Sequence, residues 1–157
     1  MKRAIVTPDK HFPFEDKAAI KVLCKAIELV KPDIYIDLGD TGEWESVSHW
    51  QWKKKKRPPL EYQLPFVYKE IADVMYGHHH DIQQSSITNM EGVKSAWSIG
   101  CLKDMRSDAN KWLGNREHNW QHAFAIVDFH PNKNFNVTVH QIVKGVSTVD
   151  GKVLTPK

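Results

Sequence analysis

The chain has 157 residues, of which 41% are hydrophobic and 26% are charged. This length and composition predict a single globular domain spanning 1–157 and exclude a disordered or fibrous chain. The formal net charge of +3 is only mildly basic and by itself indicates no partner. Because the sequence has no apolar run of about 18 residues and no long apolar signal region, we expect a soluble, cytoplasmic protein without a membrane partner.

The two cysteines, Cys24 and Cys101, lie within apolar periodic segments and form no closely spaced pair. This arrangement predicts reduced, buried thiols rather than a disulfide framework. Cysteine-based zinc sites and nucleophilic cysteine chemistry are disfavoured for the same reason.

The first forty residues have the pattern of a strand, a helix and a second strand. The apolar run 4–6 predicts a buried strand, and apolar residues then recur at helical spacing from Asp16, a candidate N-cap, to Val30. Pro32 ends this helix, and a second apolar run at 34–38 predicts the next strand. Such a unit has parallel strands, so residues that follow the two strands meet at the carboxyl edge of the sheet.

Side chains that bind metals follow these strands. Asp9 and His11 come after the first strand, and Asp40 follows the second. A third short strand is expected at 73–76, and the histidine run 78–80 lies just beyond it. Carboxylates and imidazoles suit Mn, Fe and Zn. If the three strands are neighbours in one sheet, these motifs predict a single metal site.

The remainder of the chain predicts mostly antiparallel strands. Apolar or alternating runs occur at 95–102, 123–129 and 137–143, with a shorter run near 146–154. The intervening segment 103–119 is polar and is expected to be a surface loop with a short helical turn.

A basic and aromatic stretch lies between the second and third strands. Residues 44–57 contain three Trp and five consecutive cations, and a short helical stretch is expected around 61–71. Such a run is usually a solvated face. Aromatic and cationic side chains together also bind phosphate backbone and stack on bases. Two interpretations therefore stay open: a solvated surface, or contact with a nucleic-acid substrate or partner.

The order of these motifs resembles the calcineurin-like metallophosphoesterase family, whose pattern runs D-x-H, G-D, G-N-H-D/E, a lone H and G-H-x-H. Residues 9–11 match the first element, 36–41 match the second, and 73–80 match the last. The stretch 44–57 also resembles small phage-encoded members. The resemblance implies an α/β fold, in which mixed sheets form a sandwich flanked by helices.

Two elements of the family pattern are missing. Only 36 residues separate Asp40 from Gly77, and no G-N-H-D/E lies between them. The sequence at 114–118 reads Gly-Asn-Arg-Glu-His, but it comes after the last motif and contains an insertion, so it is no match. The resemblance therefore implies a truncated sandwich. Because the loss of central strands exposes sheet edges, we expect a homo-oligomer.

Carrying the family's metal ligands over to this sequence leaves one complete set. The resemblance assigns the first metal to Asp9, His11, Asp40 and His80, which implies about one Mn, Fe or Zn ion per chain. The second metal would keep only Asp40 and His78, because its other ligands belong to the missing block. The resemblance also assigns catalytic roles to Asp40, as the bridging ligand, and to His78.

Residues beyond the last histidine motif help to line the cleft in the family. This makes Arg116 and His118 candidates for binding the phosphate of a substrate, whereas structural contacts within the loop are the alternative. Trp97, Trp112 and Trp120 are expected in the core or at an interface rather than in the site.

These features predict a metal-dependent phosphoesterase, with a phosphodiester such as nucleic acid as its substrate. An incomplete second metal site and a missing general acid predict weakened activity, by about 10² to 10⁴-fold for the acid alone. The alternative is an inactive relative that keeps one metal and only binds nucleic acid or another protein. A mononuclear iron oxygenase is disfavoured, because no H-x-D pair lies on a predicted strand.

Overall fold

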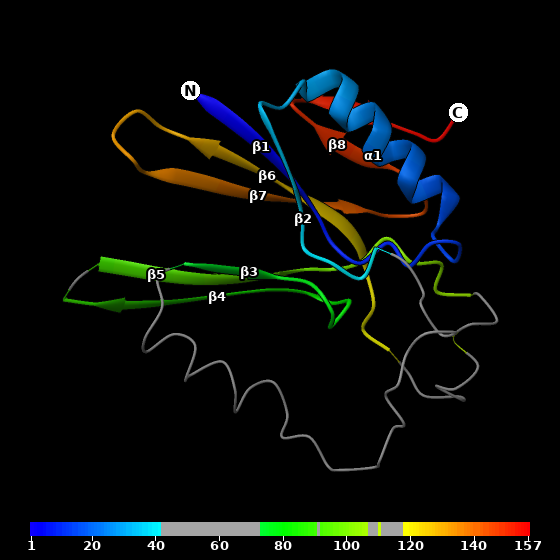
Figure 1. Cartoon of the computed structure of the whole chain (residues 1–157), viewed down its shortest axis with the longest axis horizontal. Coiled ribbons are helices and arrows are strands. Elements are labelled where there is room, and N and C mark those ends of the chain that lie inside the picture. The colour runs from blue at the N-terminus through cyan, green and yellow to red at the C-terminus, as the bar shows by residue number, and fades with distance from the viewer. Residues whose placement is uncertain (42–72, 91, 107–109, 111–117) are drawn as a thin grey trace, which may run out of the picture.

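In the computed structural model, residues 1–41, 73–90, 92–106, 110 and 118–157 are described. Their elements, in chain order, are β1 (Lys2–Thr7), α1 (Lys17–Val30), β2 (Ile34–Asp37), β3 (Val74–Tyr76), β4 (Ile82–Asn89), β5 (Gly92–Ile99), β6 (His122–Phe129), β7 (Phe135–Ile142), β8 (Ser147–Val149) and β9 (Lys152–Leu154). A larger sheet has the strand order β2-β1-β6-β7, and a smaller sheet has the order β3-β5-β4. The two sheets lie in separate layers, with α1 on the far side of the larger one (Figure 1).

The β-α-β unit predicted from the sequence is present. β1 and β2 pair in parallel, with Thr7 opposite Asp37 at their carboxyl ends. α1 begins after Asp16, whose carboxylate accepts a 2.7 Å hydrogen bond from the Ala19 N–H and so caps the helix. Within the described residues, no helix is both long enough and apolar enough to cross a bilayer.

Alternating side chains of β1 pack on both faces of the larger sheet. Ile5 belongs to a buried cluster that includes Phe124 of β6 and the inner face of α1. Ala4 and Val6 belong to a second cluster, which includes Trp97 of β5. Because successive side chains of a strand point to opposite faces, α1 covers one face of this sheet and the smaller sheet covers the other. This is the α/β sandwich of mixed sheets predicted from the sequence.

The later strands also follow the prediction. The runs at 95–102, 123–129 and 137–143 correspond to β5, β6 and β7, and the run near 146–154 is the β8–β9 hairpin. β6 is antiparallel to both of its neighbours, β1 and β7. β5 is parallel to β3 and antiparallel to β4.

β4 is a strand that the hydrophobic pattern does not reveal. Its sequence, Ile-Gln-Gln-Ser-Ser-Ile-Thr-Asn, is mostly polar, and it forms an edge of the smaller sheet. Since an edge strand with exposed side chains needs no apolar face, its pairing with β5 defines it, from Ile82 opposite Ile99 to Asn89 opposite Gly92.

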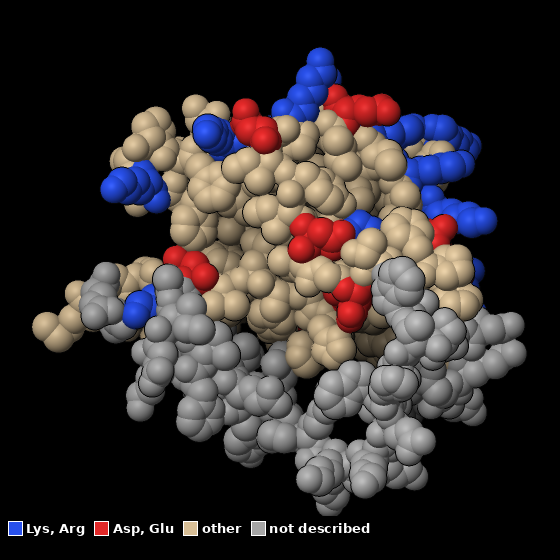
Figure 2. Space-filling model, viewed as in Figure 1, with Lys and Arg blue, Asp and Glu red and all other residues tan. Residues whose placement is uncertain are grey.

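The two free cysteines differ in exposure, and the prediction of a buried Cys24 is wrong. The buried positions of α1 are Ala19, Val22, Leu23 and Ala26. Cys24 lies on the opposite side of the helix and is exposed. Lys and Arg side chains also gather where α1 lies (Figure 2), as expected for the outer face of an amphipathic helix. Cys101 is buried as predicted, and this burial raises the pKa of its thiol to about 12.

Candidate metal centre

Asp9, His11 and His80 come together where β1 and β3 end. One potential ligand atom from each residue lies within 4.8 Å of those of the other two. Asp9 and His11 follow β1 of the larger sheet, whereas His80 follows β3 of the smaller sheet. The sequence-based expectation that the motif strands are neighbours in one sheet is therefore wrong. The candidate ligands converge from both layers of the sandwich.

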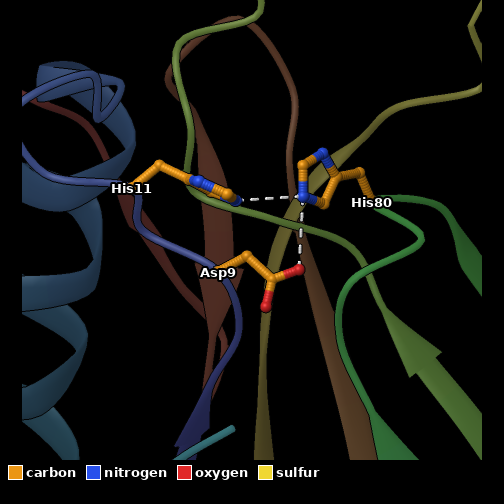
Figure 3. Close-up of side chains that lie close together, drawn as sticks. All are labelled: Asp9, His11 and His80. Carbon is orange, nitrogen blue, oxygen red and sulfur yellow. Dashed lines mark hydrogen bonds and ion pairs between the residues drawn. The ribbon is translucent and has the colours of Figure 1, made fainter. Parts of the chain in front are cut away.

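The spacing of the ligand atoms fits a metal ion. His80 Nε2 lies 3.3 Å from Asp9 Oδ2 and 3.3 Å from His11 Nε2, and the three side chains point toward one another (Figure 3). With metal–ligand bonds of about 2.0–2.2 Å, the ligand atoms of a tetrahedral site lie about 3.3–3.6 Å apart. One carboxylate and two imidazoles suit Zn, Fe or Mn. The donor set and its geometry therefore fit one divalent transition metal.

The Asp9 carboxylate is buried and held in its ionised form. The exposed fraction of its side chain is 1%, against 8% for His80. Burial raises the pKa of Asp9, but the His80 side chain and the backbone N–H of His78 outweigh this effect and hold the pKa below its usual value. A metal ligand must be deprotonated, so this environment suits metal binding.

Gly77 allows the loop after β3 to approach this carboxylate. The backbone N–H of His78 donates a hydrogen bond to Asp9 Oδ2. A Cβ atom on residue 77 would lie 2.6 Å from Asp9 Oδ1 and 3.1 Å from its Cγ. Because 2.6 Å is too short for a nonbonded contact, any larger residue would force the loop or the carboxylate to move, which explains the glycine of the predicted motif.

Four of the predicted site residues have a left-handed backbone conformation. Their φ angles are 54° for His11, 44° for Asp40, 69° for His78 and 62° for His80. Eight non-glycine residues of the described chain have positive φ, so half of them are predicted site residues. This conformation costs about 1–2 kcal/mol per residue. Its concentration at one place is typical of functional sites.

Asp40 and His78 form an exposed pair beside the three candidate ligands. His78 Nδ1 lies 3.1 Å from Asp40 Oδ2, and their side chains are 67% and 46% exposed. Asp40 is not a member of the group of three, although it is predicted as the bridging ligand. Both residues line a hollow of about 330 Å³ together with Asp9. The other residues that line it are Leu38, Gly39, Met75, Tyr76 and Gly77.

A polar network links the loop after β1 to the loop after β2. Lys10 Nζ lies 2.6 Å from Asp37 Oδ2, and Asp37 also accepts hydrogen bonds from the Gly39 N–H and the Thr41 hydroxyl. Burial raises the pKa of Asp37, but these donors, led by Lys10, outweigh it and lower the pKa. Lys10 and Asp37 lie within the matched segments 9–11 and 36–41, but the family pattern specifies neither residue, so no sequence motif indicates a role for them.

The aromatic residues near the centre only partly follow the predictions. Trp97 is in the core as expected, with 7% exposure. Trp120 lies against His80 instead, with ring centroids 4.5 Å apart. His118, which is predicted to bind the phosphate of a substrate, also contacts Trp120, with ring centroids 5.2 Å apart. Arg116 and Trp112 lie outside the described residues, as does the basic stretch 44–57.

Comparison with solved structures identifies the class of fold. The chain is similar to Vps29 from Entamoeba histolytica, whose crystal structure was determined in complex with Zn²⁺. The TM-score is 0.52 at 13% identity, and the match covers 96% of this chain and 95% of that chain. Vps29 has a calcineurin-like metallophosphoesterase fold, so this chain has a metallophosphoesterase-like sandwich.

The structural similarity to Vps29 does not support two finer predictions from the sequence, namely that the chain resembles phage-encoded members and that it has lost an internal block. No protein-family model matches the sequence, and no curated protein matches it. The fold is therefore assigned from the structure, whereas the function rests on the chemistry of the candidate metal centre.

Proposed function

We propose that this protein is a metal-dependent phosphodiesterase that uses one divalent transition metal, held by the group Asp9, His11 and His80 with Asp40 as a further ligand. The main evidence for this proposal is the convergence of the three side chains. Asp9 Oδ2 and His11 Nε2 each lie 3.3 Å from His80 Nε2. The zinc complex of the Vps29 that this chain resembles supports testing Zn beside Mn and Fe.

A metal at this centre would supply Lewis acidity, which polarises a phosphoryl oxygen and lowers the pKa of water. The protein's own part is to hold Asp9 ionised and both imidazoles facing inward. The hollow beside Asp9 offers space for a phosphoryl group, with Asp40 and His78 among its lining residues. We assign Asp40 as a further ligand and as the partner that orients His78, and His78 as the group that contacts the substrate.

The proposed activity is slow, because the second metal site lacks two of its family ligands. We expect an activated aryl phosphodiester to be cleaved more readily than an alkyl diester, since its leaving group departs without help from an acid. The aromatic and basic composition of 44–57 supports single-stranded nucleic acid as a further test substrate.

The test combines metal analysis and turnover on the same purified chain. We expect about one tightly bound metal per chain after dialysis, and Mn-stimulated hydrolysis of bis(4-nitrophenyl) phosphate. His11→Ala should lose both properties and Asp40→Ala most of them, whereas the matched control His130→Ala, at a histidine that bonds Asn136, should retain both. Turnover no faster than that of His11→Ala would disprove the catalytic proposal.

A second candidate function is a metal-containing binding protein without catalysis. The pairing of Asp40 with His78, outside the group of three ligands, favours it because neither side chain then completes a second metal site. A chain that binds one metal but shows no turnover would support this reading. Retention of single-stranded nucleic acid by that chain would identify its ligand.

A further inference from the structure

Lys10 lies between two candidate ligands in the sequence, and its side chain is buried. Asp9 precedes it and His11 follows it. Its Nζ lies 2.6 Å from Asp37 Oδ2, and the two side chains are 6% and 32% exposed. The same Nζ lies 5.8 Å from the centroid of the Tyr35 ring. Lysine is almost never this buried unless it is paired, so Asp37 is needed to keep Lys10 in this position.

Asp37 also organises the loop after β2. Its Oδ1 accepts from the Gly39 N–H at 3.1 Å, and its Oδ2 accepts from the Thr41 hydroxyl at 3.0 Å. Gly39 and Asp40 have φ angles of 109° and 44°, so two successive residues of this loop have left-handed conformations. Gly39 adopts its conformation without a Cβ penalty, whereas Asp40 adopts an unfavourable one. The hydrogen bonds that Asp37 accepts from Gly39 and Thr41, on either side of Asp40, therefore stabilise this path.

The loop after β2 in turn holds the backbone of a candidate ligand. The N–H of His11 donates to the Asp40 carbonyl at 2.9 Å, and the N–H of Phe12 donates to the Thr41 carbonyl at 2.8 Å. His11 itself has a φ of 54°. A shift of this loop would therefore change the direction of the His11 imidazole.

We infer that Lys10 and Asp37 are positioning residues for the candidate metal centre. Their ion pair holds the loop after β1 against the loop after β2, so that the His11 imidazole faces Asp9 and His80. This inference rests on the metal centre of the proposed function. The physical reason is preorganisation: ligands that are already aligned need no reordering when the metal binds, and loss of an outer-shell partner commonly lowers metal affinity by about 10 to 100-fold.

The opposing explanation is a purely structural ion pair that stabilises the edge of the sheet. Arg3 provides a matched control, because it lies on the same strand, β1, near the end away from the metal centre. Its Nε lies 2.6 Å from Asp128 Oδ1, and its Nη1 lies 2.6 Å from Asp150 Oδ2. Arg3→Met removes ion pairs from β1 without altering either loop at the metal centre.

The experiment is a Co²⁺ titration of the full chain. Binding is monitored by the visible d–d absorption of Co²⁺, which reports the geometry of its ligands. Lys10→Met and Asp37→Asn should each weaken Co²⁺ binding by about 10 to 100-fold and change the spectrum of the loaded protein. The double variant should bind about as well as either single variant, because the two residues act as one unit. Lys10→Arg should restore most of the affinity.

Thermal unfolding in the presence of a chelator separates stability from metal geometry. Arg3→Met should lower the unfolding midpoint while it retains the affinity and spectrum of the wild type. Lys10→Met with wild-type affinity and spectrum would overturn the inference, and so would an equal loss of affinity in Arg3→Met. If Lys10→Met does not fold, Thr41→Val removes one donor to Asp37 at an exposed position, and an unchanged spectrum there would also overturn it.

The same titration distinguishes failure of this inference from failure of the proposed function. A wild-type chain that binds no Co²⁺ overturns the metal centre itself. A wild-type chain that binds Co²⁺, with variants that bind it equally well, overturns only the positioning role of Lys10 and Asp37.

Discussion

Asp9 is the most deeply buried of the three candidate metal ligands. It is nearly inaccessible, lies 3.3 Å from His80 Nε2 and accepts a hydrogen bond from the backbone of His78. Its carboxylate also lies directly against the position that Gly77 leaves open. A change of a few tenths of an ångström here would alter the spacing of the ligands, so this contact is a sensitive point for mutation.

Gly77→Ala should damage the metal centre without unfolding the protein. The new Cβ would lie 2.6 Å from Asp9 Oδ1, so either the carboxylate or the loop after β3 must move. We expect a loss of metal affinity of at least about 10-fold, together with a loss of about 1–3 kcal/mol in the free energy of unfolding. Isothermal titration with Zn²⁺ and chemical denaturation of the metal-free chain measure the two effects.

Gly151→Ala is the control for this substitution. Gly151 has a φ of 74°, in the left-handed region, but a Cβ there would meet nothing within 4 Å. Its replacement should lower stability and leave metal affinity unchanged. Equal affinities for Gly77→Ala and the wild type would show that Asp9 does not depend on this close approach.

Among the elements, the ends of β1 and β3 carry the candidate ligands, whereas α1 has a supporting role. The helix packs its inner face on Ile5 and Phe124 in the core cluster, on the face of the larger sheet away from the smaller one. Asp16 caps the helix, and its own N–H donates to the Leu102 carbonyl at 2.8 Å. The helix therefore stabilises the sheet from which β1 presents Asp9 and His11.

Asp16→Ala should lower the free energy of unfolding by about 0.5–2 kcal/mol, because the Ala19 N–H loses its capping partner. Asp16→Asn should cost much less, since asparagine is also a good N-cap. Urea denaturation monitored by circular dichroism measures both effects. An equal loss in the two variants would mean that the charge of Asp16, which lies 3.9 Å from His122 Nδ1, is what matters rather than the cap.

At the scale of the whole molecule, the candidate metal centre joins the two layers of the sandwich. Asp9 and His11 follow β1 of the larger sheet, and His80 follows β3 of the smaller one. A bound metal would therefore cross-link the layers. At one edge of the larger sheet, β2 exposes Ile34, Tyr35 and Ile36. The homo-oligomer expected from the sequence stays a prediction.

Removal of the metal should destabilise the entire chain. A ligand that binds only the folded state stabilises it by about 2.7 kcal/mol at a free concentration 100 times its Kd. We therefore expect EDTA to lower the thermal unfolding midpoint of the wild type and to leave that of His11→Ala nearly unchanged. Calorimetry with and without Zn²⁺ measures the shift. The same EDTA effect in both proteins would place the stabilising metal elsewhere.

The sequence by itself determined the local elements and the residue types at their ends. Helical periodicity with the Asp16 cap predicted α1, and apolar runs predicted β1 and β2 with Asp9 and His11 just beyond the first strand. These features can be predicted from the sequence because hydrophobic spacing and helix capping depend on residues that are close together in the chain. The fold class followed from them, together with the order of the motifs.

Only the tertiary structure decided which of these residues meet. The polar edge strand β4, the placement of β3 in the smaller sheet, and the approach of Trp120 to His80 all depend on pairing between distant segments. The same holds for Asp40, which pairs with His78 beside the three candidate ligands rather than among them. Such contacts depend on strand order and loop conformation, which result from interactions between segments far apart in the chain. No local sequence pattern therefore predicts these contacts.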